Sequence, residues 1–384
     1  MSSENFIPDD MQDGGAGDTG GSSGDGRARI AELSQEAYQL LRQNEIDAAE
    51  AKFQEILEHD GTNNYALVGL GDAARKRRNC DAAVEYYERC LEAHPRNNYA
   101  LFGLADCYKS MRQFKRAIEY WEEYLQLDDE NVTVLTRVAD AYRKTKNYER
   151  SRQLYDRVLE LEADNAYALI GLGHLNYDFK RYQDALYYWE RMREISGEDV
   201  DIRVLTSIGN CHRKLKNFEQ GIPLFQEALD REPRNFYALF GLADCYRGLG
   251  ESASSLYYWN KILERDPRNK VILTRAADAY RAMGDFREAR EYYEGALNIE
   301  YDTYAVLGLA LLNRMEGKLD QAVKALRQLV EHEPRNTRFY VELAHTFLDL
   351  QDERNAMLTL RELFDRGLQD RHAADLYNRL KGPR

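Results

Sequence analysis

The stretch YALFGLADCY at residues 99–108 occurs a second time, unchanged, at residues 237–246. A second echo has the same offset, because LTRVADAYRK at 135–144 returns as LTRAADAYRA at 273–282. Two echoes with one offset indicate that a block of the chain has been duplicated in tandem.

A shorter period of 34 residues runs through the duplicated block and beyond it. The segment NYALFGLADCYKSMRQFKRAIEYWEEYLQLDDEN from Asn98 follows NYALVGLGDAARKRRNCDAAVEYYERCLEAHPRN from Asn64. The same frame gives ten units, with a two-residue insertion before Ile202 and a one-residue deletion before Thr303. The units start at Ile30, Asn64, Asn98, Val132, Ala166, Ile202, Phe236, Lys270, Thr303 and Thr337. Self-similarity of this length is typical of a repeat protein.

Each unit predicts two amphipathic helices, because apolar residues recur at steps of three and four. In the unit from Asn98 they are Leu101, Leu104, Ala105 and Tyr108, then Phe114, Ala117, Trp121 and Tyr124. Proline at position 32 of several units should end the second helix, and asparagine at position 34 suits the N-cap of the next. The tryptophans at position 24 (Trp121, Trp189, Trp259) and cysteines at position 10 (Cys107, Cys211, Cys245) are predicted to be core residues.

This pattern resembles the tetratricopeptide repeat over residues 30–370. The resemblance implies an all-α fold, a right-handed superhelical α-solenoid of helix-turn-helix repeats with a concave groove lined by the first helix of each repeat. We expect repeats 1–5 in residues 30–201, repeats 6–10 in residues 202–370, and a C-terminal capping helix in residues 371–384. The inserted residues, Gly221 and Pro223 predict a bend around residues 196–223.

Residues 1–29 are predicted to be a disordered, acidic and glycine-rich tail, since the first 26 residues hold six acids and no Lys or Arg. The net charge of −13 argues against nucleic acid as a partner. No apolar run reaches the length of a membrane span, so membrane insertion is not expected. Five cysteines without CxxC spacing and the absence of a secretory signal predict reduced thiols and a cytoplasmic location.

Glycine occupies position 6 in five units, each time four residues after a tyrosine. A glycine inside a helix costs about 1 kcal/mol relative to alanine, so five of them need a reason. Side chains lean toward the helix N-terminus, and we therefore expect the tyrosine ring to lie on the backbone of its own helix above the glycine. The pairs are Tyr65–Gly69, Tyr99–Gly103, Tyr167–Gly171, Tyr237–Gly241 and Tyr304–Gly308.

In the tetratricopeptide family, positions 2, 5, 6, 9, 12 and 13 face the groove, and the resemblance implies the same here. Aspartate at position 9 and arginine at position 12 would form a ladder of helix neighbours. In an alternative interpretation the ladder only solvates the groove, and the tyrosine at position 2 bonds Asp at position 9 of the preceding repeat. The predicted partner-binding residues are Tyr65, Asp72, Arg75, Tyr99, Phe102, Asp106, Lys109, Thr136, Arg137, Asp140, Arg143, Tyr167, His174, Asn210, Arg213, Tyr237, Phe240, Asp244, Arg247, Thr274, Arg275, Asp278, Arg281 and Tyr304.

The predicted function is a non-catalytic scaffold or adaptor that binds a protein or peptide along this groove, without a cofactor or metal. The segments outside the repeats are too short for a catalytic domain, and no nucleophile elbow or phosphate loop is present. The alternative is a substrate-recruiting or regulatory arm of an enzyme complex, similar to the arms of O-linked glycosyltransferases, which carry asparagine where this chain has aspartate. The residues of a carboxylate clamp are missing, and self-association is left open.

Overall fold

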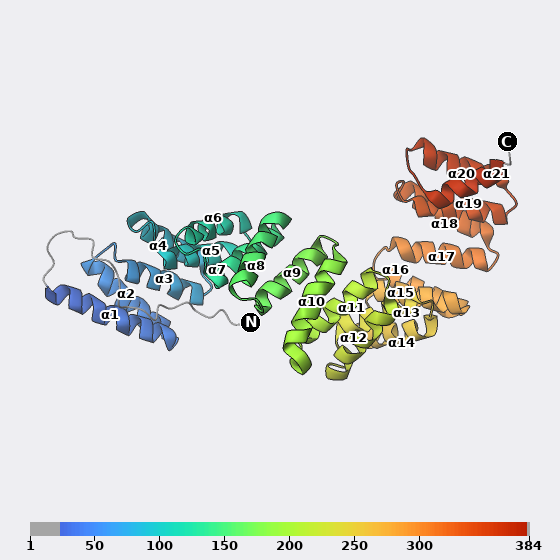
Figure 1. Cartoon of the computed structure of the whole chain (residues 1–384). Coiled ribbons are helices and arrows are strands. Elements are labelled where there is room, and N and C mark those ends of the chain that lie inside the picture. Colours follow the sequence, from blue (N-terminus) through green and yellow to red (C-terminus); the bar gives the residue numbers. More distant parts are fainter. Residues whose placement is uncertain (1–23, 382–384) are drawn as a thin grey trace. The chain divides into compact units, whose positions relative to one another are not determined.

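The computed structural model describes residues 24–381, which form 21 α-helices and one 3-10 turn and contain no strand. The predicted tail over residues 1–29 lies outside the described part up to residue 23, and helix α1 begins at Gly24. The chain divides into two compact units, Met1–Ile195 and Ser196–Arg384. Within each unit the helices follow one another as antiparallel pairs in contact, as Figure 1 shows by colour along the chain.

The first unit contains five helix pairs. They are α1 (Gly24–Arg42) with α2 (Ile46–His59), α3 (Asn64–Lys76) with α4 (Cys80–Ala93), α5 (Asn98–Ser110) with α6 (Phe114–Leu125), α7 (Val132–Lys144) with α8 (Tyr148–Leu161), and α9 (Ala166–Asp178) with α10 (Tyr182–Ser196). The odd-numbered helix of each pair is called helix A below, and the even-numbered one helix B.

The second unit begins with the 3-10 turn Gly197–Asp199, which holds part of the inserted segment, and continues with five pairs and a last helix. The pairs are α11 (Ile202–Lys214) with α12 (Phe218–Arg231), α13 (Phe236–Gly248) with α14 (Ser252–Leu263), α15 (Lys270–Met283) with α16 (Phe286–Leu297), α17 (Thr303–Met315) with α18 (Leu319–His332), and α19 (Thr337–Asp349) with α20 (Glu353–Asp365). Helix α12 continues through Pro223. The bend predicted for this region stays a prediction.

Nine of the ten predicted repeat starts are the first residue of a helix A, from Asn64 to Thr337. Except for Asn336, the asparagine before a helix A acts as the predicted cap, because its side chain accepts a hydrogen bond from the third helical N–H. The Asn97 side chain accepts from the Ala100 N–H at 2.9 Å, and Asn235 accepts from Ala238 at 3.1 Å. Such a cap contributes about 1 kcal/mol relative to alanine. The periodic pattern therefore predicted the helix register correctly.

The turn between helix A and helix B has a conformation that the sequence did not reveal. Position 15 of every repeat has a positive φ, which L-residues other than glycine, Asn and Asp adopt rarely. Glycine fills it in repeats 7, 8 and 9, but Arg112 and Lys146 have φ values of 60° and 63° in repeats 3 and 4. Each such residue costs about 1–2 kcal/mol. Packing of the two helices therefore stabilises this turn against local preference.

The core lies between helices A and B of one repeat and between helix B and the next helix A. The predicted apolar positions are buried, with Trp121 and Trp259 fully so, and the cysteines at position 10 are buried fillers as expected. Burial raises the pKa of the Cys107 and Cys245 thiols to about 12. Helix α21 (Arg371–Lys381) packs on α19 and α20 through Ala373 and confirms the capping helix, whose last three predicted residues lie outside the described part.

Candidate interaction surface

The tyrosines at position 2 lie on the A helices and are mostly open to solvent. Tyr167, Tyr237 and Tyr304 are 67%, 68% and 59% exposed, and Tyr65 is 36% exposed. Tyr99 is half-buried. Aromatic side chains of this size normally remove apolar surface from water when a chain folds. We call Tyr65, Tyr99, Tyr167, Tyr237 and Tyr304 the tyrosine row.

The glycines at position 6 make room for rings of the preceding repeat and not for the rings of the tyrosine row. The prediction that each tyrosine ring lies on the glycine of its own helix was wrong. A β-carbon on Gly241 would lie 2.3 Å from the Phe225 ring, which comes from helix B of the preceding repeat. A β-carbon on Gly103 would likewise lie 2.3 Å from the Tyr87 ring. The full set of pairs is Phe53–Gly69, Tyr87–Gly103, Tyr155–Gly171, Phe225–Gly241 and Tyr293–Gly308. Glycine is needed there because a buried ring at position 24 lies against the backbone of the next helix A.

Tryptophan at position 24 produces a different joint. After Trp121 and Trp259, the next helix A carries Arg137 and Arg275 at position 6 instead of glycine. Helices α3 and α5 pack directly, as do α11 and α13, but α5 and α7, like α13 and α15, have at most marginal contact. The larger indole and the missing glycine together keep these A helices apart. We call the α5/α7 and α13/α15 boundaries the open joints of unit 1 and unit 2.

The charge ladder is largely neutralised within the protein. Arg75 contacts Asp72 of its own helix at 3.4 Å and Asp106 of the next repeat at 3.0 Å. Arg143 likewise contacts Asp140 at 2.7 Å and Asp178 at 2.6 Å. These bonds tie successive A helices together. Most of the Asp–Arg row therefore stabilises the stack, and few of its charges remain for a ligand.

Some aspartates at position 9 also accept a hydrogen bond from a tyrosine at position 24 of their own repeat. The Tyr87 and Tyr293 hydroxyls donate to Asp72 and Asp278 at 2.7 Å, and both tyrosines stand at position 24 of the same repeat. Burial, followed by the field of Asp72, raises the pKa of Tyr87 well above its ordinary value. In these two repeats the tyrosine at position 24 bonds the aspartate, and the alternative pairing with the tyrosine at position 2 stays a prediction.

The predicted site residues at positions 5, 9 and 12 are split between core and surface. Phe102 is buried, Phe240 is half-buried, and Thr274 is buried with its hydroxyl donating to the Lys270 carbonyl at 3.0 Å. Lys109 lies over the Trp121 ring, 5.9 Å from its centre, and burial lowers its pKa.

Three further predicted site residues lie at position 9 or 12 of other repeats. Burial, with the nearby Arg143, lowers the pKa of His174, whose ring lies 5.4 Å from that of Trp189. In repeat 6, the Asn210 side chain accepts from Arg213 at 3.1 Å. These side chains therefore also have partners within their own unit.

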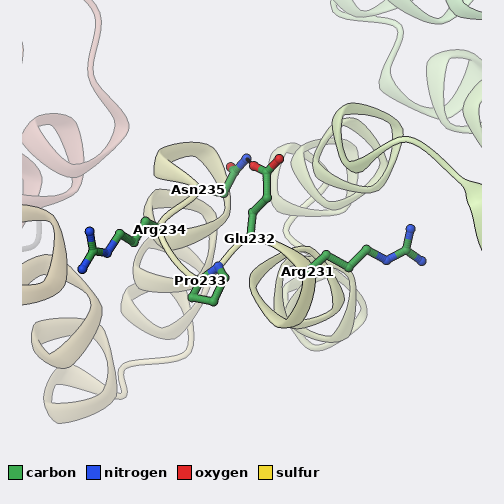
Figure 2. A pocket seen from close by; sticks show the side chains of 5 residues that line it. All are labelled: Arg231, Glu232, Pro233, Arg234 and Asn235. Carbon is green, nitrogen blue, oxygen red and sulfur yellow. Dashed lines mark hydrogen bonds between the residues drawn. The ribbon is translucent and has the colours of Figure 1, made fainter.

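Concave features also occur at the turns between repeats. Figure 2 shows one of about 490 Å³ at the turn from α12 to α13, lined by Arg231, Glu232, Pro233, Arg234 and Asn235. The Asn235 amide donates to the Glu232 carboxylate at 2.9 Å, and Arg231 donates to the Val200 carbonyl at 2.7 Å. The Arg231 and Arg234 side chains point away from each other. Because its polar groups mostly bond one another, this depression offers few free groups for chemistry.

Comparison with known proteins places the repeats in a family. Tetratricopeptide repeat families match residues 35–79, 68–132 and 207–270, residues 109–175 and 314–380, and residues 272–303. The chain belongs to the tetratricopeptide repeat family. Among curated proteins, none is similar enough in sequence to match. The all-α solenoid of paired helices agrees with this membership.

Solved tetratricopeptide structures resemble the chain at low identity. The C-terminal part of a repeat-containing protein from Cytophaga hutchinsonii is 14% identical, with a TM-score of 0.53 over 63% of this chain and 98% of that one. PilF of Pseudomonas aeruginosa is 15% identical, with a TM-score of 0.47 over 56% and 96%. YrrB, described as having an unusual peptide-binding site, is 21% identical, with a TM-score of 0.43 over 48% and 95%. The first of these supports the fold. Within residues 24–381, no helix has the length and apolarity needed to cross a bilayer.

Proposed function

We propose that this protein is a non-catalytic interaction scaffold that binds an extended segment of a protein or peptide partner along its A helices. The observation that carries the proposal is the tyrosine row, in which four of the five large rings are exposed while most other large rings of the described repeats are buried or half-buried. Tyrosine is enriched among residues that dominate binding energy, because it combines apolar area with a hydroxyl group. Membership in a repeat family that stacks into an extended surface supports the same function.

A comparison within single repeats tests the proposal. Repeat 5 has Tyr167 on helix A and Tyr187 on helix B, 67% and 61% exposed, and repeat 7 has Tyr237 and Tyr257, 68% and 56% exposed. The double variant Tyr167→Ser/Tyr237→Ser should lose most capture of partner proteins from native lysate, while Tyr187→Ser/Tyr257→Ser should retain it. Both variants should keep the wild-type melting temperature. Equal capture by the two variants would contradict the assignment to the A helices.

A further inference from the structure

We propose that the open joint of unit 2 binds the acidic N-terminal segment of a second copy of this chain, residues 4–13 (ENFIPDDMQD). The proposal rests on the proposed function, since it uses the same A-helix face and names one partner for it. It follows from a difference between the two open joints, which share a ten-residue sequence and differ in how one arginine is used.

In unit 1 the arginine at the open joint is satisfied internally. The Arg137 guanidinium donates to one oxygen of Asp106 at 2.7 Å, and Arg75 donates to the other oxygen at 3.0 Å. Arg137 also lies over the Phe102 ring, 5.0 Å from its centre. Lys109, which follows the shared decapeptide, makes no ion pair with any described residue and lies over Trp121.

In unit 2 both oxygens of the equivalent Asp244 accept from other arginines, and the equivalent Arg275 has no partner among the described residues. Arg213 donates to one oxygen at 2.6 Å, and Arg247 donates to the other through two nitrogens at 2.9 and 2.7 Å. Arg247 takes the place of Lys109. Within the described part of the chain, half-buried Arg275 makes no ion pair, hydrogen bond or ring contact.

Exposed apolar side chains occur near the start of the two A helices that form this joint. Phe236, Tyr237 and Val271, at positions 1 and 2 of repeats 7 and 8, are 44%, 68% and 46% exposed. The Trp259 ring lies 5.1 Å from the half-buried Phe240 ring. A guanidinium without a partner among the described residues and exposed apolar side chains together suit a ligand that has carboxylates next to apolar side chains.

The N-terminal segment has this composition. Phe6, Ile7 and Pro8 are followed directly by Asp9 and Asp10, and the first basic residue of the chain is Arg27. The apolar residues would contact Tyr237 and Val271, and an aspartate would take the free Arg275. We assign the segment to a second copy, and binding within one chain, which would leave the protein monomeric, is the opposing outcome of the sedimentation test below. Such a head-to-tail contact is heterologous, so mass should rise with protein concentration.

Complementation between two full-length variants tests the assembly. Phe6→Ser/Ile7→Ser removes the apolar part of the segment, and Tyr237→Ser/Arg275→Ala removes the receiving site. In sedimentation velocity, wild type should show a concentration-dependent increase in average mass, and each variant alone should stay monomeric. An equimolar mixture should again form pairs, since one chain supplies a segment and the other a site. Monomeric wild type at every concentration, or no pairing in the mixture, would overturn the assignment to a second copy.

Titration of a fluorescein-labelled peptide of residues 3–13 tests the site itself. The receiver is the full-length Phe6→Ser/Ile7→Ser chain, whose own segment does not compete. Adding Arg275→Ala should weaken binding at least tenfold. Arg247→Lys should weaken it too, because the loss of the Arg247 hydrogen bonds leaves an oxygen of Asp244 able to accept from Arg275. Arg268→Ala, which removes an exposed arginine of unit 2, should change affinity less than twofold. Absent binding, or equal losses for Arg268→Ala and Arg275→Ala, would refute the site, while capture of other partners through the tyrosine row would still support the proposed function.

Discussion

The two copies of YALFGLADCY have the same sequence and the same helix, yet their surroundings differ. In unit 1, Phe102 is buried beneath Arg137 and packs edge-on against Tyr124, and Tyr99 is half-buried. In unit 2, Phe240 is only half-buried and Tyr237 is largely exposed. A small number of neighbouring residues accounts for this difference in exposure.

Two of the substitutions outside the decapeptide change the contacts of these side chains. Position 27 is Tyr124 in unit 1 and the shorter Ile262 in unit 2, which removes a ring from the packing around position 5. Position 12 is Lys109 in unit 1 and Arg247 in unit 2. Of these two, only Arg247 donates a hydrogen bond to the aspartate at position 9. A duplicated block can therefore keep its fold while the arginine at one open joint is paired, as Arg137 is, and the arginine at the other, Arg275, is not.

The largest expected effect on the free energy of unfolding concerns the buried tryptophan at position 24, which the two copies share. Trp121→Ala and Trp259→Ala should each lower the free energy of unfolding by about 3–5 kcal/mol, because each removes a fully buried ring. Urea unfolding followed by circular dichroism measures this. A much smaller loss for Trp259→Ala would indicate that the indole of unit 2 serves binding more than packing.

The next largest effect concerns the arginine at position 6 of the following repeat, which should contribute to stability in one copy and not in the other. Arg137→Ala should cost about 2 kcal/mol, since it removes a partly buried, charge-assisted hydrogen bond to Asp106 and a cation–π contact. Arg275→Ala should change stability by less than about 0.5 kcal/mol, as expected for a residue without partners. Paired urea titrations of the two variants provide the measurement, and similar losses would remove the difference between the joints.

A smaller effect tests the pairing of ring and glycine. Gly241→Ala places a β-carbon 2.3 Å from the Phe225 ring, and overpacking costs about 1–3 kcal/mol, offset by about 1 kcal/mol of helix propensity. A net loss of about 1 kcal/mol is expected. In a Phe225→Leu background the same change should cost less or become stabilising. A double-mutant cycle measures the coupling, and strictly additive losses would show that ring and glycine do not interact.

The smallest effect is a pH dependence at Asp244. Burial opposes its ionisation, but the hydrogen bonds and charges of Arg247 and Arg213 outweigh burial and hold the pKa of Asp244 below its ordinary value. A depressed pKa stabilises the fold above the ordinary aspartate range, and this stability is lost as the pH falls through the pKa of the folded protein. Asp244→Asn should therefore flatten the fall in unfolding free energy between about pH 5 and pH 2. An unchanged slope would show that the two arginines do not hold the charge.

The helical periodicity was sufficient to predict helix starts, caps, core positions and the family, because these depend on local spacing. The reason for glycine at position 6 was also present in the sequence, since Phe53, Tyr87, Tyr155, Phe225 and Tyr293 each precede it by 16 residues or fewer. It was missed because the contact joins two helices, while the prediction considered neighbours within one.

Other features could not be predicted from the sequence by local rules. Arg112 and Lys146 have the left-handed backbone conformation at a turn where later repeats have glycine, so their residue types do not indicate it. The exposure of Tyr237 differs from that of Tyr99 within identical decapeptides, so no local pattern could separate them. The identity of the predicted partner-binding residues remains a prediction, with Tyr167, Tyr237 and Tyr304 as its most exposed tyrosines.

Site-specific photocrosslinking tests the central claim most directly. A benzophenone side chain is placed at Tyr237 on helix A of repeat 7, or at Tyr257 on helix B of the same repeat, and the full-length protein is irradiated with its partners. The account predicts abundant adducts from position 237 and few from position 257, although both side chains are exposed. Adducts formed mainly from position 257 would contradict an interaction surface on the A helices.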